Sequence, residues 1–517
     1  MSYKSSLVRK LLLAALLATH VFAATPKDTI VIGVENETKR INPLFDGDHD
    51  PALYFVFSGL TRFAPDMKVE PDLAKSWEVS EDGLNWIFHL RDDVLWHDGQ
   101  KFSAADVEFT ISQVLNDKIN TPARANFEEI KEVKVVDPQT IQIALKTPFP
   151  SLLDVLSLGI LPKHLLQGKD VSTDPFNQHP IGTGPFQLVQ WQKGSHISFV
   201  ANPHFYRGKP KSPKIILKIV PDHSVRTYEI KNGSLDVALI EPNLVKKLKD
   251  DKNIKIMDFK SADYRALMFN FHNPILKSLA VRQAIEYAIN RKLIATKVLH
   301  GYGSVANNPI QVSWANDPHA KTYPYNPKKA KEILEKDGWK LHNKVFVKDG
   351  KPLEFDIYAR SHNPIRVALA NILQSELSKV GIKAHAIAKN NGAFEISKVD
   401  AFIIGWGSPL DPDMQTYRVF SSKMDSSTNK AGWNYSHYSD PKVDEALLKA
   451  RTATSLEERK TWYAKFINAL HDNPPFAFLV YLNYPLAYNT KIHGIKSTIL
   501  GHHGARFTHN VEEWSKD

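Results

Sequence analysis

Residues 71–107 read PDLAKSWEVSEDGLNWIFHLRDDVLWHDGQKFSAADV. The aromatic residues of this stretch alternate with polar residues, as they do in strands that pack one face on a core. They are Trp77, Trp86, Phe88 and Trp96. The pair Asp98-Gly99 follows them, and because both residue types tolerate positive φ, the pair predicts a tight turn. We therefore expect a strand-rich segment with an aromatic core.

Outward from this stretch, the chain mixes strand-like and helix-like patterns, which is typical of an α/β fold. Short apolar runs predict strands at 29–34, 141–145 and 215–220. Helical spacing of apolar residues predicts helices at 280–289, 327–336 and 367–377. Because one hydrophobic core stops growing near ~250–300 residues, a chain of 517 residues should form at least two lobes, with room for a cleft between them. The irregular segment 270–277 is a candidate hinge.

The composition excludes several classes of site. The net charge of +10 is modest, and its Lys and Arg residues are interspersed with acids, so we expect no nucleic-acid partner. With no cysteine, the chain cannot form disulfides, thiolate metal sites or a cysteine nucleophile. Any metal must therefore be bound through nitrogen or oxygen, and the chain has 21 histidines.

The first 23 residues have the pattern of a signal peptide. Basic residues precede the apolar run LLLAALLA at 11–18, and small residues at 21–23 flank a cleavage point, so the mature chain should begin at Ala24 or Thr25. No cysteine follows the run, which excludes a lipid anchor on that residue and favours a free periplasmic protein. No later stretch has spanning length, so the chain is not expected to be a permease.

The sequence lacks the common catalytic motifs. The phosphate loop, the dinucleotide-binding turn, the zinc-protease helix motif and the nucleophile elbow are all absent from it. The nearest match, Gly182-Thr183-Gly184-Pro185, lacks a third glycine and predicts a tight turn. We expect no enzyme activity and no cofactor.

The stretch 71–107 resembles the peptide, nickel and opine family of periplasmic solute-binding proteins that serve ABC importers, also called solute-binding family 5. Further matching segments follow in order: INPL at 41–44, PIGTGPF at 180–186, NPHFYRGKPK at 202–211, AVRQAIEYAINR at 280–291 and YNPKKAKEILEKDGW at 325–339. The resemblance covers essentially the whole mature chain.

This resemblance implies a two-lobed α/β binding protein of the cluster C type, whose discontinuous first lobe closes like a hinge on a ligand in the interlobe cleft. We expect lobe one at 24–268 plus 491–517, and lobe two at 269–490. The resemblance also implies a monomer that delivers its ligand to a cognate ABC permease in the inner membrane.

The loop at 401–412, AFIIGWGSPLDP, bears on the ligand. Peptide-binding members typically carry an aspartate three residues after the tryptophan, where its carboxylate pairs with the peptide's ammonium group. This chain has Pro409 there, and the loop is similar to that of nickel-binding members. Asp411 remains a partial substitute for the missing clamp, so dipeptide or oligopeptide binding stays as the alternative.

Histidine placement also favours nickel. His502 and His503 stand between two glycines near the C-terminus, and His49 lies in a loop near the start. Imidazole is a suitable donor for Ni(II) when thiolates are absent, so we predict these residues as metal ligands. The alternative is that His502 and His503 are ordinary surface-loop residues.

Four further residues are predicted to contact the ligand. By resemblance, Arg124 and Phe127 match an arginine and aromatic pair, and Trp406 matches an aromatic wall. The other arginine expected at 158–161 is absent, which disfavours a tricarboxylate-like chelator. Arg366 is a candidate replacement from the second lobe, or alternatively a solvent-facing helix residue.

The sequence therefore predicts a receptor for Ni(II), free or as a small chelate such as one with free histidine. Nickel is the transported ligand and not a cofactor in this hypothesis. An extracytoplasmic chaperone or a metallo-hydrolase is the alternative from another functional class.

Overall fold

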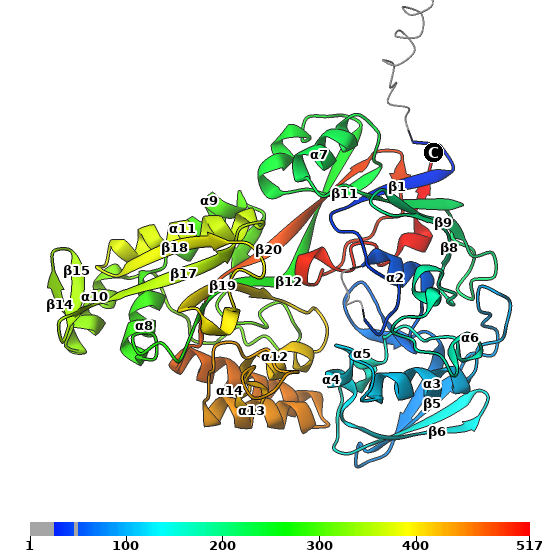
Figure 1. Ribbon diagram of the computed structural model, residues 1–517, viewed down its shortest axis with the longest axis horizontal. Helices are drawn as coiled ribbons and strands as arrows, with labels where there is room; N and C mark the ends of the chain where they lie inside the picture. The colour runs from blue at the N-terminus through cyan, green and yellow to red at the C-terminus, as the bar shows by residue number, and fades with distance from the viewer. Residues whose placement is uncertain (1–24, 46–49) are drawn as a thin grey trace, which may run out of the picture.

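A mixed sheet runs through the molecule and joins its two lobes (Figure 1). The computed structural model describes residues 25–45 and 50–517, so the predicted signal peptide at 1–23 lies outside the described residues. In spatial order the strands are β18 (Lys383–Lys389), β17 (Glu354–Arg360), β19 (Ala401–Trp406), β12 (Ile254–Phe269), β20 (Phe476–Asn489), β11 (Val237–Leu239), β1 (Thr29–Val34), β10 (Lys214–Ile219), β9 (His196–Ala201) and β8 (Phe186–Gln192). In addition, β13 (Gly303–Val305) pairs with β20. The expected two-lobed α/β architecture is present.

Two long antiparallel strands, β12 and β20, cross from one lobe to the other. Their register shifts between Lys260 and Tyr264. Before this shift, β20 pairs with both β12 and β11 in the first lobe, and after it β12 also pairs with β19 in the second. Both strands belong to both lobes, and our proposed boundaries at 268/269 and 490/491 fall at their far ends. The predicted hinge at 270–277 begins on the second lobe, where Asn270 N donates to Asp400 O over 3.0 Å.

The stretch at 71–107 forms part of a four-stranded antiparallel sheet in the first lobe. Its strands, in spatial order, are β4 (Ala74–Val79), β5 (Asn85–Leu90), β7 (Thr140–Leu145) and β6 (Ile130–Asp137). Trp86, Phe88 and Trp96 are buried as predicted, and the rings of Trp86 and Phe88 stack. Gly99 has φ of 86°, in agreement with the predicted turn.

Helices and short strands complete each lobe. The first lobe adds α2 (Pro51–Val56), β2 (Thr61–Phe63), β3 (Val69–Pro71), α3 (Ala104–Leu115), α4 (Arg124–Phe127), α5 (Leu152–Val155), α6 (Lys163–Leu166), α7 (His223–Lys231), β21 (Ile492–His493) and β22 (Ser515–Lys516). The second adds α8 (Leu279–Ala288), α9 (Arg291–Leu299), α10 (Pro327–Lys336), β14 (Lys340–His342), β15 (Val345–Lys348), β16 (Lys351–Pro352), α11 (Pro364–Ser378), α12 (Asp413–Phe420), α13 (Pro441–Thr452) and α14 (Leu456–Asp472). The strands and helices predicted above match β1, β7, β10, α8, α10 and α11 to within a few residues.

Alternation along β12 builds a core on each face of the sheet in the second lobe. Leu267 and Phe269 point to one side, where α8, α9 and α11 contribute apolar residues. Ala266 and Met268 point to the other side, toward α12, α13 and α14. Because successive strand residues face opposite ways, one strand supports both layers. A separate core fills the first lobe.

No helix within 25–45 or 50–517 is both long and apolar enough to cross a membrane.

The turn at Gly182–Gly184 fastens the end of α2 in the first lobe. Gly184 N donates to Val56 O over 2.8 Å. A Cβ built on Gly182 would lie 1.8 Å from Val56 O, so this position requires glycine because of close backbone approach.

We expect Gly182→Ala to lower the free energy of unfolding by about 2 kcal/mol or more, since a backbone carbonyl cannot move aside cheaply. Gly208→Ala is the matched control: Gly208 has φ of 104° but no atom within 4 Å of the added Cβ, so only backbone strain of about 1 kcal/mol is expected. Thermal unfolding of both variants checks this. Equal loss in the two would contradict the close-packing argument.

Candidate functional site

The C-terminal segment docks on the irregular part of β12. Ala262 N donates to Leu500 O over 2.9 Å, and Leu500 N donates to Lys260 O over the same distance. Two residues further on, His502 N donates to Gly407 O over 2.9 Å. The segment therefore carries His502 and His503 to the place where β12 crosses between the lobes and the loop after β19 begins.

The carboxylate of Asp263 is the centre of this arrangement. Its side chain is 0% exposed, and it accepts hydrogen bonds from His502 Nδ1 over 2.8 Å and from His503 N over 3.1 Å. Tyr484 OH donates over 2.5 Å, and Arg265 Nη1 forms an ion pair with it. Burial alone would raise the pKa of Asp263, but Arg265 and His502 hold that pKa well below its usual range. The group is therefore a buried carboxylate anion.

Arg265 pairs with Asp263 in a space that glycine provides. Arg265 on β12 lies opposite Gly405 on β19. A Cβ on Gly405 would lie 2.4 Å from Arg265 Nη1, so a larger residue would displace the guanidinium. The buried ion pair thus depends on residues of both strands.

Asp263 also selects the tautomer of His502. Because a carboxylate only accepts hydrogen bonds, Nδ1 of His502 carries the proton and the lone pair lies on Nε2. Burial lowers the pKa of His502 to about 4, although Asp263 acts in the opposite direction, so the ring is neutral at neutral pH. A neutral imidazole held through its other nitrogen is the usual form of a metal-ligating histidine.

His503 lies beside His502. The two ring centroids are 4.0 Å apart, and the backbone of His503 has φ of 55°, in the left-handed region. This conformation directs the His503 amide to Asp263. Both predicted ligands thus sit on one short turn, His502–Gly504, anchored by a single carboxylate.

An aromatic wall stands next to this turn. Trp406 stacks on Trp433 with ring centroids 4.6 Å apart and planes at 6°, and the Trp406 ring is 6.0 Å from that of His502. The guanidinium of Arg418 covers the far face of this pair, with its carbon 3.6 Å from the centroid of Trp433. Trp406 Nε1 is buried and has no hydrogen-bond acceptor among the described residues. The wall can therefore offer a ligand both an aromatic surface and one donor.

Arginines give the site an excess of positive charge. Arg366, at the start of α11, is 5% exposed and donates to Ile403 O over 2.8 Å, so it does not face solvent. The pKa of Arg366 is lowered to about 9, mainly by burial and secondly by the positive charge of Arg265. The positive charges of Arg265 and Arg366 both lower the pKa of the His502 ring, while Asp263 supplies one negative charge. An anionic ligand group would compensate this excess.

Arg124 and Phe127 occupy α4 in the first lobe. Arg124 Nε donates to Val114 O over 3.2 Å, and its Nη2 donates to the carbonyl oxygens of Asn116 and Ile119. The guanidinium thus closes the end of α3. Phe127 is 3% exposed and lines a cavity between the lobes. The ligand role of both residues stays a prediction.

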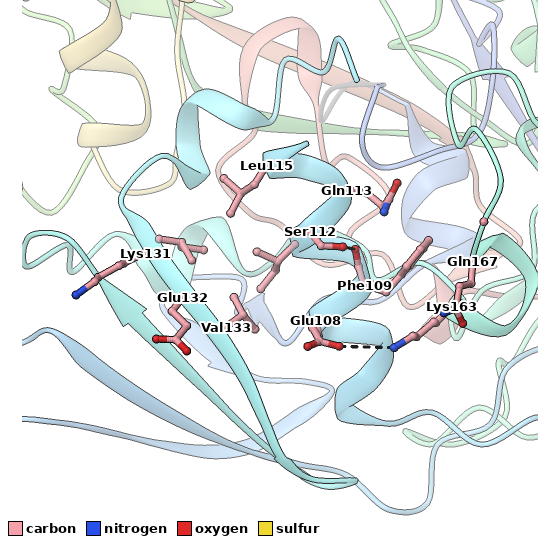
Figure 2. Close-up of a pocket in the computed structure, with 13 residues that line it drawn as sticks. Glu108, Phe109, Ser112, Gln113, Leu115, Lys131, Glu132, Val133, Lys163 and Gln167 are labelled. Atoms are coloured by element: carbon pink, nitrogen blue, oxygen red, sulfur yellow. Dashed lines mark hydrogen bonds and ion pairs between the residues drawn. The ribbon is translucent and has the colours of Figure 1, made fainter. Parts of the chain in front are cut away.

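The interlobe cavity has a volume of about 110 Å³. Residues of the first lobe, including Tyr54, Phe127 and Asp154, line it together with Leu410 and Met414 of the second. A larger groove of about 470 Å³ lies within the first lobe between α3 and β6, where Lys163 pairs with Glu108 (Figure 2). Its residues come from one lobe only, so it does not meet the expectation of a site closed by both lobes.

No group of three or more histidine, aspartate or glutamate side chains in the described part of the chain is arranged to hold a metal ion. His49, the third predicted ligand, lies outside the described residues. His502 and His503 are therefore the predicted donors that the structure describes, and their role as metal ligands stays a prediction.

Sequence reasoning missed Asp263, Trp433 and Arg418. Asp263 is 239 residues from His502 and lies in a strand without any motif around it. Trp433 and Arg418 are recognisable only through their stacking on Trp406.

Comparisons with known proteins agree with the architecture. A family model described as bacterial extracellular solute-binding proteins, family 5 middle, matches residues 68–427. The crystal structure of NikZ from Campylobacter jejuni in complex with Ni(L-His) is 53% identical with a TM-score of 0.89, covering 95% of this chain and 100% of that one.

Peptide-binding proteins are also similar. The oligopeptide-binding protein AppA from Bacillus subtilis, solved with a nonapeptide, is 27% identical with a TM-score of 0.81, covering 95% of this chain and 99% of that one. The dipeptide-binding protein of Escherichia coli K12 is 29% identical, covering 97% of this chain and 98% of its own. The comparisons thus include both predicted ligand classes.

We expect the His502 ring to stay neutral, with its proton on Nδ1, from about pH 5 upward, because its pKa is lowered to about 4 by burial. Nitrogen-15 chemical shifts of labelled histidine, assigned with His502→Gln, report both charge and tautomer. An unperturbed histidine side chain titrates near ~6.5. A His502 ring that gains charge near that value would contradict the burial argument.

Proposed function

Since the chain belongs to the bacterial extracellular solute-binding proteins of family 5, we propose that it captures Ni(II), bare or as a small chelate such as that with free histidine. The coarser role follows from the family: the chain is a solute-binding protein of an ABC importer. The finer proposal is that it works in the periplasm as a monomer and delivers nickel to a permease. Nickel is its transported ligand.

One observation carries the nickel proposal. The Asp263 carboxylate holds the neutral ring of His502 through Nδ1 and the backbone of His503 through its amide. A carboxylate–imidazole pair of this kind orients a ring for metal binding and raises its basicity. Imidazole nitrogen is a suitable donor for Ni(II) in a chain without cysteine. We propose His49 as a third ligand.

The arginines support a chelate over the bare ion. Arg265 and Arg366 bring more positive charge than Asp263 neutralises, which disfavours a naked cation and favours a ligand that carries a carboxylate. The α-carboxylate of a free histidine would provide that charge. The likeness to a protein solved with Ni(L-His), at 53% identity, supports the same chelate.

The peptide alternative loses its candidate clamp. Asp411, which follows Pro409, is 6% exposed and its two oxygens accept from Arg459 over 2.5 and 2.7 Å. This carboxylate is already neutralised by a guanidinium, so it does not offer a free charge to a peptide ammonium group. The similarity to peptide-binding relatives keeps this alternative as an outcome of the test.

Calorimetric titration of the metal-stripped chain from residue 25 tests the proposal. We expect one-site binding of NiCl₂ that tightens when L-histidine is present, and no heat from a dipeptide mixture. Replacing His502 and His503 together by alanine should weaken nickel binding by more than ~10-fold, which is about 1.4 kcal/mol.

The matched control replaces two exposed histidines, His319 and His342, by alanine and should bind as the wild-type chain does. Unchanged affinity in the His502/His503 variant would exclude ligation by that pair. Heat from dipeptides with none from nickel would establish the peptide alternative instead.

A second variant separates the chelate from the ion. Arg366→Gln keeps a donor for Ile403 O but removes the positive charge, so it should reduce the gain from L-histidine by about 10-fold or more and leave binding of NiCl₂ alone within about 2-fold. Lys389→Gln removes an exposed charge on β18 and serves as control. A full histidine-dependent gain in Arg366→Gln would show that Arg366 does not meet the carboxylate.

A further inference from the structure

A buried cluster of charged residues connects the two lobes away from the histidines. Asp154, on α5 of the first lobe, accepts a hydrogen bond from the backbone N of Asp411, which precedes α12 of the second lobe, over 2.8 Å. Arg459, on α14, binds both oxygens of Asp411, and its Nη2 lies 3.4 Å from Ser151 Oγ of the first lobe. Asp154, Asp411 and Arg459 are 8%, 6% and 5% exposed, so little of the cluster is accessible to water in this arrangement.

Acids outnumber arginines around this contact. Arg459 forms an ion pair with Asp411, and the neighbouring Arg451 forms one with Asp413 over 2.7 Å. Glu129 of the first lobe lies 3.6 Å from Arg451. For Asp154 the structure describes one cross-lobe donor, the backbone N of Asp411, and no ion pair. A buried carboxylate with so little compensation is more stable when it holds a proton.

We propose that Asp154, Asp411 and Arg459 form a latch between the lobes, and that Asp154 takes up a proton when the lobes close. When the lobes separate, Asp154 regains water and loses its contact with Asp411, so it releases that proton. Closure is therefore linked to pH. The inference rests on the two-lobed fold and not on the identity of the ligand.

The pKa of Asp154 agrees with this geometry. In the closed arrangement the pKa of Asp154 is raised to about 8, mainly because the carboxyl is buried and secondly because Asp411 is nearby. The positive charge of Arg459 lowers this pKa in part. In water an aspartate titrates near ~3.9. The closed state thus binds more protons than the open state, so closure is favoured at low pH and weakens as the pH rises through the interval between these values.

Other polar and titratable groups also lie near Asp154. Ser151 and the apolar residues Val155 and Leu158 adjoin it in the first lobe. From the second lobe, the charged or titratable groups are Asp411, Asp413, Arg451, Arg459 and Tyr463. Burial, together with Asp411 and Asp413, raises the pKa of Tyr463 well above its usual value, so its hydroxyl stays neutral. Burial also raises the pKa of Asp413, whose ion pair with Arg451 lies within the second lobe and does not depend on contact between the lobes.

The latch also lies on the same loop as the aromatic wall. Asp411 lies on the loop that begins at Trp406. Pro409 of the same loop packs on the histidine turn, since a Cβ on Gly501 would lie 3.4 Å from Pro409 Cδ. Closing the latch therefore fixes the loop that shapes the ligand site.

A distance measurement between the lobes tests the latch. The chain has no cysteine, so Val79→Cys on β4 and Leu448→Cys on α13, both exposed, can carry a pair of nitroxide labels for pulsed electron resonance. In the ligand-free labelled chain we expect the closed-to-open ratio to fall about 10-fold or more between about pH 6 and pH 8.5. Asp154→Asn, which mimics the protonated carboxyl, should keep the low-pH distribution across this range.

Two further variants sharpen the test. Asp154→Ala also lacks the titrating group and should likewise show no pH response, whatever its closed fraction. Asp106→Asn is the matched control, because Asp106 is a buried carboxyl of raised pKa whose hydrogen-bond partners, Ser103 and Lys163 N, all lie in the first lobe. It should retain the wild-type pH response. A wild-type distribution that does not change with pH, or a pH response retained by both Asp154 variants, would overturn the proposal.

Discussion

The ion pair between Asp263 and Arg265, buried where β12 crosses between the lobes, is the interaction on which the site depends. A buried carboxylate is costly unless charge and donors compensate it. Here Arg265 on the same strand supplies the charge, and the other donors come from distant parts of the chain: Tyr484 on β20 and the turn that carries His502 and His503. The need to satisfy one carboxylate therefore brings the two crossing strands and the C-terminal segment to one point.

A second acid–arginine contact, between Asp411 and Arg459, lies at the end of the loop that follows Trp406. Asp263 of the first contact orients His502 and the backbone of His503, and Asp411 of the second contact donates its backbone N–H to Asp154 of the first lobe. In both cases a guanidinium binds a carboxylate away from water, where breaking the pair costs several kcal/mol. The loop from Trp406 to Asp411 is thus fastened near its start by the backbone bond from His502 N to Gly407 O, and at its end by the bond from Asp411 N to Asp154.

Local patterns in the sequence predicted most of the scaffold. Aromatic alternation identified Trp86 and Phe88 as core, and helical spacing identified α8, α10 and α11, because these features depend on neighbours in the sequence. The site was predicted less completely. Trp406 and His502 were chosen by motif and lie near each other, whereas Asp263 and Trp433 are defined by contacts across long sequence separations that no local pattern encodes.

The central claim is that the turn carrying His502 and His503 holds a nickel complex between the lobes. Anomalous diffraction at the nickel absorption edge, from crystals grown with NiCl₂ and L-histidine, tests it most directly. The account predicts one dominant peak in the interlobe cleft, within about 2.1 Å of an imidazole nitrogen of this turn, with histidine density extending toward Arg366. Peaks confined to surface histidines, with the cleft empty or filled by a peptide, would contradict it.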